Sequence, residues 1–537
     1  MKSFNYIKTI FILITAIGVI SCSKDLDETE DLGLLTPASI DSDAKDWLPI
    51  EAGTMTVTKI AVPIPVDTTD AVKKAAYDAT YQSDLAAIKD SQSKLTESQR
   101  KVIEYWGAGG VLRWNQILRK LVAQYSLAPA PRDDGSYVFP DAENPFADPQ
   151  FPFSSPPYAA RAYSYVSVAQ YEALKSAWYY KDLYKAYKRK APYNLDNTIQ
   201  ALVPKTDLLA YPSEDGVMSG VTVELLKALF PASIEEITLH AAEQRNAALW
   251  SGKATATDIS VGLALGKSVA ALYLARAKGD GMGKAIGIKA QWAVLADSAK
   301  LHYAKIGVNA TNEIFWKSLD APARPPMLPF FGNVSTWIVT RPELVSKRPG
   351  PPPSTSSEKM KTDLAEVKSI SENLTREQLA IVHKWADGGG TYTPPGHWND
   401  IAAEHIRDAN FSEVRAARAF ALLNMAMHNA SVGCWEAKYY WFNPRPSQLD
   451  PSIKTATGLP NFPAFVSGHS TFSASAATVL SYLFPSSTSK FNADSEEASI
   501  SRLYGGIHYR ADIEVGKTHG AALSDYIVNF ALTDGAD

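Results

Sequence analysis

The sequence predicts an all-α protein built from two similar helical bundles. Apolar residues recur at three- and four-residue spacing in six long stretches, which is typical of buried helices. No stretch alternates polar and apolar residues between hairpin turns, so a sheet is not expected. The two halves of the chain also repeat each other at a constant offset, which indicates an internal duplication. At 537 residues, the chain is longer than one hydrophobic core usually supports.

Each predicted helix is bounded by its apolar pattern. In the first half the pattern covers residues 160–180, 220–229 and 259–277, and in the second half 414–440, 470–483 and 513–532. Ser467 or Ser470 is a suitable N-cap for the helix over 470–483, and Pro485 would end it. We expect these helices to form two units that each resemble a four-helix bundle.

The N-terminus predicts processing and anchoring. Residues 1–21 join positive charge to a short apolar run and end in Val19-Ile20-Ser21 before Cys22, which resembles a bacterial lipoprotein box. That resemblance implies cleavage before Cys22, acylation of its thiol and a lipid-anchored protein on the periplasmic or surface side of a bacterial cell envelope. Residues 22–45 are rich in acidic residues at their start and predict a flexible tether. A plain secretory signal with an incidental cysteine is the alternative.

Composition excludes some function classes. Hydrophobic residues make up 46% of the chain and charged residues 20%, as in an ordinary globular protein. The net charge of −4 offers no electrostatic basis for binding nucleic acid. The only other cysteine, Cys434, lies in an apolar helical stretch, so we expect a buried small residue with no disulfide partner.

The duplication divides the chain into a first copy over residues 46–299 and a second over 358–537. Ser213 and Ser467 are 254 positions apart, as are Pro231 and Pro485. Between the copies, residues 300–357 are rich in proline, which favours extended backbone. This connector is either a linker or, through residues 316–337, a lid or substrate wall.

Three ordered motifs in the second copy point to a pocket for a tetrahedral oxyanion. They are Lys438 with Arg445-Pro446, then Ser467-Gly468-His469, then Arg502 with His508 and Asp512. Arginine offers a planar fork of donors and lysine a compact charge. Ser467 and the Gly468 amide add neutral donors at a helix start that favours anions. Two histidines can divide the roles of nucleophile or ligand and of general acid–base.

The first copy lacks most of these groups. The constant offset places Asp215 opposite His469, Ala248 opposite Arg502 and Ala254 opposite His508. The same offset places Ala191 opposite Arg445. An alignment that matches Trp178 to Trp435 would place Lys188 there instead. We therefore expect only the C-terminal copy to carry an intact site.

The motifs resemble the signature that vanadium-dependent haloperoxidases share with type 2 phosphatidic acid phosphatases and bacterial acid phosphatases. One position departs from the phosphatase pattern, because Val466 stands where that pattern has proline. Phe462, seven residues before His469, and Trp435, three before Lys438, resemble the haloperoxidase branch. The resemblance also implies an all-helical fold.

The resemblance implies a role for each residue. His508 would coordinate vanadate and His469 would handle protons, while Lys438, Arg445, Ser467, Gly468 and Arg502 would hold the oxyanion. Asp512, four residues after His508, is suitably spaced to fix the His508 tautomer, unless it is a plain surface residue. Phe462 and Trp435 would line the halide side. His397 lies in a loop that is longer in the second copy, so it is either a pocket residue or a surface histidine.

Two chemistries use the same core. The first is vanadate-dependent oxidation of halide by hydrogen peroxide. The second is hydrolysis of a phosphate ester, in which His508 attacks phosphorus and His469 protonates the leaving alcohol; it needs no vanadate. The Phe462 segment and the long duplicated chain favour the first. A non-catalytic lipoprotein is disfavoured, because the second copy keeps every acid–base residue.

Overall fold

The structure is a computed structural model that describes residues 32–50, 61–65, 71–127, 130–137 and 155–536. The helices belong to one packed unit that begins at Leu34. Within the described ranges no strand forms, and the extended backbone makes a single isolated bridge, Lys190 to Leu209. The predicted all-α class is therefore confirmed. In chain order the α-helices are α2 (Ala71–Ser93), α3 (Glu97–Gly107), α4 (Gly110–Tyr125), α5 (Pro156–Leu183), α6 (Pro192–Leu195), α7 (Glu214–Leu229), α8 (Ile234–Trp250), α9 (Ala256–Gly279), α10 (Lys289–Lys305), α11 (Arg341–Ser346), α12 (Glu358–Glu372), α13 (Arg376–Lys384), α14 (Thr393–Asp408), α15 (Glu413–Trp441), α16 (Pro446–Leu449), α17 (Gly468–Leu483), α18 (Thr488–Tyr504) and α19 (Arg510–Ala531).

All six helices predicted from periodicity are present, as α5, α7, α9, α15, α17 and α19. Helix α17 begins directly after its N-cap Ser467 and ends at Leu483, two residues before Pro485. The apolar pattern located these helices to within a few residues, because each presents apolar side chains to the interior. Capping residues then fixed the ends.

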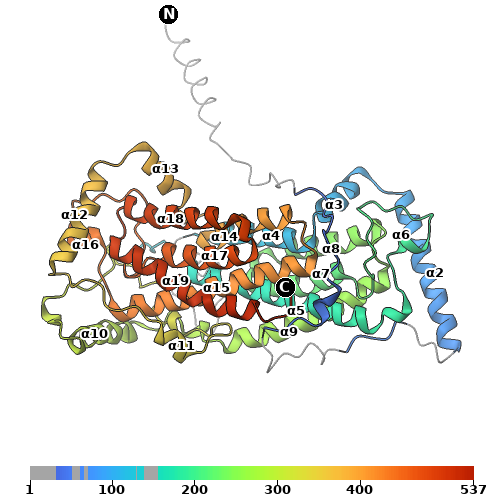
Figure 1. Ribbon diagram of the computed structural model, residues 1–537, viewed down its shortest axis with the longest axis horizontal. Coiled ribbons are helices and arrows are strands. Elements are labelled where there is room, and N and C mark those ends of the chain that lie inside the picture. The colour runs from blue at the N-terminus through green and yellow to red at the C-terminus, as the bar shows by residue number, and fades with distance from the viewer. Residues whose placement is uncertain (1–31, 51–60, 66–70, 128–129, 138–154, 537) are drawn as a thin grey trace, which may run out of the picture. The chain divides into compact units, whose positions relative to one another are not determined.

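Two helix pairs pack at unusually close range. Helix α9 lies against α7, and α19 lies against α17 in the red part of the ribbon (Figure 1). In the first pair, a Cβ on Gly262 would lie 2.3 Å from the Ser213 carbonyl oxygen. In the second, a Cβ on Gly520 would lie 2.2 Å from the Thr471 carbonyl oxygen. Only glycine allows backbones to approach this closely. The two pairs resemble each other, as a duplication predicts, but the duplication stays a prediction.

The two halves share one interior instead of forming separate bundles. Helices α5 and α15 pack against each other and are buried along nearly their whole length. Each also packs on the paired helices of its own half, α5 on α7 and α9, and α15 on α17 and α19. Asn115 of α4 donates to Asn399 of α14 over 2.8 Å, which adds a buried polar link across the halves. The proposed domain boundaries stay predictions.

The described end of the predicted tether is packed, which corrects the expectation of a flexible segment up to residue 45. Asp41 is buried, pairs with Arg415 at 2.7 Å and accepts a hydrogen bond from Ser412. Ala44 and Trp47 are also buried. The acidic stretch that suggested flexibility lies mostly at residues 25–31, outside the described residues.

The connector over 300–357 packs against the second half. Trp337 is fully buried, and its backbone amide donates to the Asn429 side chain of α15 over 2.9 Å. Phe331 is fully buried and Met327 contacts α15 through its carbonyl oxygen. The middle part of this segment is therefore packed on α15, and its role as a lid or substrate wall stays a prediction.

Candidate oxyanion site

The N-termini of α17 and α19 meet at the candidate site. The Ser467 hydroxyl caps α17 by accepting from the Ser470 amide over 3.4 Å. The Ser467 amide donates to the Asp512 carbonyl oxygen over 2.9 Å, which ties the two helix starts together. Gly516, one turn into α19, lies close to Ser467, since a Cβ there would be 2.9 Å from its carbonyl oxygen. Free amides at a helix start favour an anion. Gly468 is the first residue of α17.

Two neighbours set the tautomer of His508. Its Nδ1 lies 2.9 Å from Asp512 Oδ2, and its Nε2 lies 3.0 Å from Nη1 of Arg445. A guanidinium can only donate, so Nε2 accepts and carries no hydrogen. Nδ1 therefore carries the hydrogen and donates to the carboxylate. This arrangement directs the Nε2 lone pair toward the cations, which is what a ligand or a nucleophile needs. Asp512 is fully buried and is not a surface residue.

Arg445 and Lys438 are buried and anchored on backbone carbonyls. Arg445 Nε donates to Phe462 over 3.0 Å, and Nη1 also donates to Ile507 over 2.8 Å. The Lys438 ammonium donates to Pro463, Ala464 and Val466 over 2.9, 2.9 and 2.5 Å. These three bonds use all of its hydrogens, so Lys438 contributes charge and holds the segment before Ser467 in place. An oxyanion would have to compete with these carbonyls for a Lys438 hydrogen.

Arg502 approaches from α18. It is 1% exposed, and its Nε donates to the Ser501 hydroxyl over 2.8 Å. A second nitrogen donates to the Val382 carbonyl oxygen over 3.3 Å. The Asp387 carboxylate acts on Arg502 through its charge. Arg502 thus joins α18 to α13.

His469 and His397 share a carboxylate that the sequence motifs did not reveal. His397 Nδ1 lies 3.1 Å from Asp387, and His469 Nε2 lies 4.0 Å from the same carboxylate. The His397 ring stacks on Trp385 with centroids 4.3 Å apart. Among the described residues, His469 Nε2 has no hydrogen-bond partner. The His397 side chain is therefore largely covered and is not that of a free surface histidine, while its role in lining the pocket stays a prediction.

A signal for Asp387 was present in the sequence. It precedes Gly388-Gly389-Gly390 in the loop that is longer in the second half, and its backbone is left-handed with φ of 44°. A non-glycine residue in that conformation is uncommon outside turns and functional loops. No regular spacing connects it to His469, so periodicity could not find it.

Aromatic residues form one wall. Trp435 and Phe462 have ring centroids 4.9 Å apart, and the Lys438 ammonium lies 5.0 Å from the Phe462 centroid. The Trp435 indole donates to the Met327 carbonyl oxygen over 3.1 Å. Asn461 donates to the carbonyl oxygens of Arg324 and Pro325. The connector thus supports the wall from outside.

The site concentrates positive charge away from water. Burial lowers the pKa of Arg445 and of Arg502 to about 10, and it lowers the pKa of Lys438 as well. Burial, followed by the neighbouring cations, holds the pKa of His469 and of His508 well below the usual range. Burial also raises the pKa of Asp512, so this carboxylate neutralises the cations only in part. These lowered pKa values reflect a free-energy cost that an anion between the cations would remove.

The matching positions of the first half form no such cluster. Asp215 pairs with Lys253 at 2.8 Å, and Arg189 pairs with Asp258. Ala248 and Ala254 pack together in a small apolar cluster with Ile259. One feature is kept in both halves: Lys181, like Lys438, donates to two backbone carbonyls, those of Leu209 and Pro212.

The structure describes one of the two cysteines. Cys434 is fully buried and unbridged, as expected. Cys22 lies outside the described residues, and its lipidation stays a prediction.

Comparisons with known proteins give one family match and several similar folds. Residues 417–534 match the model of the PAP2 superfamily. A solved structure described as the first bacterial vanadium-dependent iodoperoxidase is 24% identical, covers 70% of this chain and 91% of its own, and superposes with a TM-score of 0.53. Holo and apo forms of a bacterial vanadium-dependent chloroperoxidase are each 13% identical and cover 71% of this chain. They cover 93% and 94% of their own chains, with TM-scores of 0.49 and 0.48. No curated protein matches the chain.

The likeness to the iodoperoxidase shows a shared helical fold. The family match falls on α15 through α19, the segment that carries every anion-binding residue described above. The C-terminal part of this chain, residues 417–534, is therefore similar to the PAP2 superfamily.

Proposed function

We propose that this chain is a vanadate-dependent haloperoxidase that oxidises halide with hydrogen peroxide. The observation that carries the proposal is the His508 ring, held with its Nε2 lone pair facing Arg445 inside a buried cation cluster. A tetrahedral oxyanion would offset the charge of Lys438, Arg445 and Arg502, each of which has a lowered pKa.

The residues present fit vanadate. His508 Nε2 would be the protein ligand, and Arg445 and Arg502 would donate to the oxygens. The Ser467 hydroxyl and the Gly468 amide would add neutral donors at the start of α17. When bound, vanadate would supply a Lewis-acidic centre that activates peroxide toward halide. Lys438 would act mainly through its charge, since its hydrogens already serve three carbonyls.

Proton handling falls to His469. Its Nε2 has no partner among the described residues and lies 4.0 Å from Asp387. Burial and Arg502 favour the neutral ring, which can accept a proton from an incoming acid such as hydrogen peroxide. Asp387 would then stabilise the protonated ring.

The alternative is a phosphatase in which His508 Nε2 attacks phosphorus. The same residues could carry out the phosphatase reaction, and the match to the PAP2 superfamily is compatible with that reaction. Two observations favour the haloperoxidase: the Trp435–Phe462 wall with its support at Met327, and the solved iodoperoxidase with the same fold over most of its length.

A two-arm assay separates the chemistries. Purified protein receives orthovanadate, peroxide, a halide and a halogen acceptor in one arm, and a chromogenic phosphate ester in the other. We expect vanadate-dependent halogenation that is lost in His508→Ala and kept in His383→Ala, which alters an exposed histidine of α13. Phosphate release that vanadate inhibits, without halogenation, would establish the phosphatase instead.

A further inference from the structure

A cavity lies next to the first-half positions that match the oxyanion site, and Ser412 and Glu413 of the second half also line it. It has an empty volume of about 660 Å³ and shares Thr206, Leu208, Glu214 and Lys253 with a neighbouring cavity of about 330 Å³. The smaller cavity is lined by Ala191, Asp215 and Ala254, the residues opposite Arg445, His469 and His508. Small side chains at these positions leave space where the second half carries its cation cluster.

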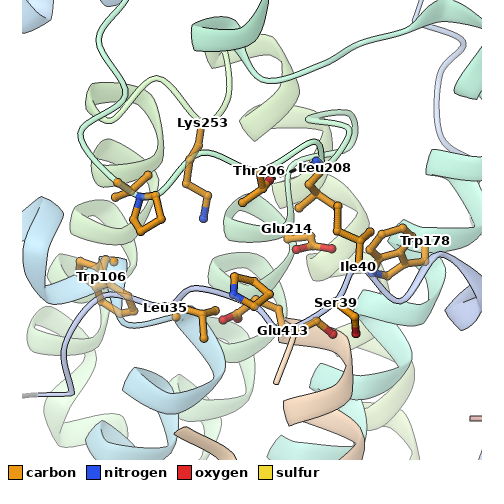
Figure 2. Close-up of a pocket in the computed structure, with 16 residues that line it drawn as sticks. Leu35, Ser39, Ile40, Trp106, Trp178, Thr206, Leu208, Glu214, Lys253 and Glu413 are labelled. Atoms are coloured by element: carbon orange, nitrogen blue, oxygen red, sulfur yellow. Dashed lines mark hydrogen bonds between the residues drawn. The ribbon is translucent and has the colours of Figure 1, made fainter. Parts of the chain in front are cut away.

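The charge of this space is the reverse of that in the second half. Lys253 is paired with Asp215 at 2.8 Å, so its charge is offset. Two more carboxylates, Glu214 and Glu413, line the larger cavity. Figure 2 shows the Lys253 ammonium and the Glu214 carboxylate pointing into the space between Trp106 and Trp178, with Glu413 reaching up from below. With Lys181, which lines the smaller cavity, two ammonium groups face three carboxylates, so negative groups are in excess.

Glu413 is held in place by the start of α4. Its Oε2 accepts from the Val111 amide over 2.9 Å. A Cβ on Gly109 or Gly110 would lie 2.4 or 3.4 Å from its carboxylate oxygens, so glycine makes room for it. Glu413 is thereby fixed, while Glu214 keeps a free oxygen.

Several polar groups at this cavity lack a partner. Among the described residues, Glu214 Oε1 is a buried acceptor without a donor. The indole nitrogens of Trp106 and Trp178 are buried donors without an acceptor, and these residues are only 3% and 6% exposed. Buried polar atoms usually find partners, and those that do not call for an explanation such as a ligand.

The carboxylates of the cavity favour a cation over an anion. Burial raises the pKa of Glu214, and it raises the pKa of Glu413 to about 7, because an ionised carboxylate is unfavourable away from water. A cation would relieve this cost, and aromatic rings also attract cations. The remaining lining is largely apolar, including Leu35, Ile40 and Leu208.

We propose that this first-half cavity binds a small primary amine with an apolar body and a hydrogen-bond acceptor. Its ammonium would donate to Glu214, and its acceptor atom would receive an indole N–H of Trp106 or Trp178. The degenerate copy of the site is then a second binding site, with selectivity opposite to that of the oxyanion site. This proposal does not depend on the chemistry at His508.

Calorimetry with three matched probes, in the absence of peroxide, tests whether the cavity selects a positively charged ligand. Tyramine carries the ammonium, 4-ethylphenol lacks it, and 3-(4-hydroxyphenyl)propanoate replaces it with a carboxylate. We expect one tyramine to bind per chain. Both other probes should bind more weakly than tyramine by about tenfold or more, because each lacks one charge-assisted hydrogen bond. Equal binding of all three, or preferred binding of the carboxylate, overturns the proposal.

Variants locate the site. Glu214→Gln should weaken tyramine binding by about tenfold or more. Trp178→Phe, which keeps an aromatic ring but removes the N–H, should weaken it by about threefold. Glu235→Gln, an exposed first-turn glutamate of α8, is the matched control and should change nothing. Tyramine binding that survives Glu214→Gln in a folded variant, or no tyramine binding to the wild type, contradicts the assignment.

Discussion

His508 is held by hydrogen bonds of opposite sense, one donated to Asp512 and one received from Arg445. This pairing removes the rotational freedom of the ring and fixes which nitrogen has the lone pair. Burial and the nearby cations keep the ring neutral, as its lowered pKa shows. Without them, the Asp512 carboxylate would favour the protonated ring. The reactive atom of the site is thus defined by its neighbours and not by the imidazole alone.

Asp512→Asn tests this tautomer control. An asparagine amide can donate to Nδ1, which would move the ring hydrogen to Nε2 and remove the lone pair from the site. We expect turnover to fall by about 10- to 100-fold with the fold intact, measured by steady-state kinetics and circular dichroism. Asp525→Asn, an exposed residue of the same helix, should leave turnover unchanged. Full activity in Asp512→Asn would show that the carboxylate plays no part.

Asp387→Asn tests the role of the shared carboxylate near His469. A carboxylate 4.0 Å away favours the protonated ring, so its removal should lower the pKa of His469 further. If His469 must be neutral to accept a proton, the acidic limb of the pH–rate profile should move about one pH unit lower. Asp408→Asn, which changes an exposed residue, is the control. If the acidic limb of the pH–rate profile does not move in Asp387→Asn, Asp387 plays no part in proton handling.

At the scale of elements, the site depends on how closely α17 and α19 approach. Gly516 and Gly520 let the α19 backbone lie against the carbonyl oxygens of Ser467 and Thr471. This contact brings the start of α17, with Ser467 and His469, next to His508 and Asp512. Helix periodicity explains that both helices exist, but the glycines explain where they meet.

Gly520→Ala should therefore damage both stability and activity. The added Cβ would lie 2.2 Å from the Thr471 carbonyl oxygen, so the helices must separate. We expect a loss of about 1–3 kcal/mol in the free energy of unfolding, measured by denaturant titration, with reduced turnover. In Gly279→Ala the new Cβ meets nothing within 4 Å, and stability should be unchanged or slightly higher. Wild-type stability in Gly520→Ala would contradict the close approach.

The sequence was sufficient to predict the six main helices, to limit the cap of α17 to Ser467 or Ser470, and to select the candidate anion-binding residues that the fold brings together. Each of these depends on local periodicity or on a short motif. Asp387 and the Met327 contact with Trp435 were not predicted, because they depend on how distant loops pack against the site. The shared interior of α5 and α15 was also missed, since both helices are apolar on nearly every face and their pattern does not show which partner each one contacts.

At the scale of the whole molecule, the first half contributes a large part of the interior without an oxyanion site of its own. Its helix α5 packs against α15, which carries Trp435 and Lys438. Its matching site positions carry Asp215, Ala248 and Ala254, and Asp258 is already paired with Arg189. The frame thus forms with alanine or a carboxylate at these places, so the fold does not require cations there.

The double variant Ala254→His and His508→Ala tests whether the first half can act as an oxyanion site when it carries a histidine. The new imidazole would project toward the cavity of about 330 Å³ that Ala254 lines, but Asp215 and Ala248 would still offer no cation for an oxyanion. We expect no recovery of turnover, with folding checked by thermal denaturation. Vanadate-dependent turnover in the double variant would show that a single histidine is enough, against the requirement for the full cation cluster.

The most direct test of the oxyanion site is a calorimetric titration of the purified chain with orthovanadate, repeated in the presence of phosphate. We expect one vanadate per chain and weaker apparent binding in the presence of phosphate. In Arg502→Gln, where one charged donor is removed, the affinity should fall by about tenfold or more. His383→Ala should bind as the wild type does. Absence of vanadate binding, or binding that is unaffected by Arg502→Gln, would contradict the assignment of the buried cluster around His508.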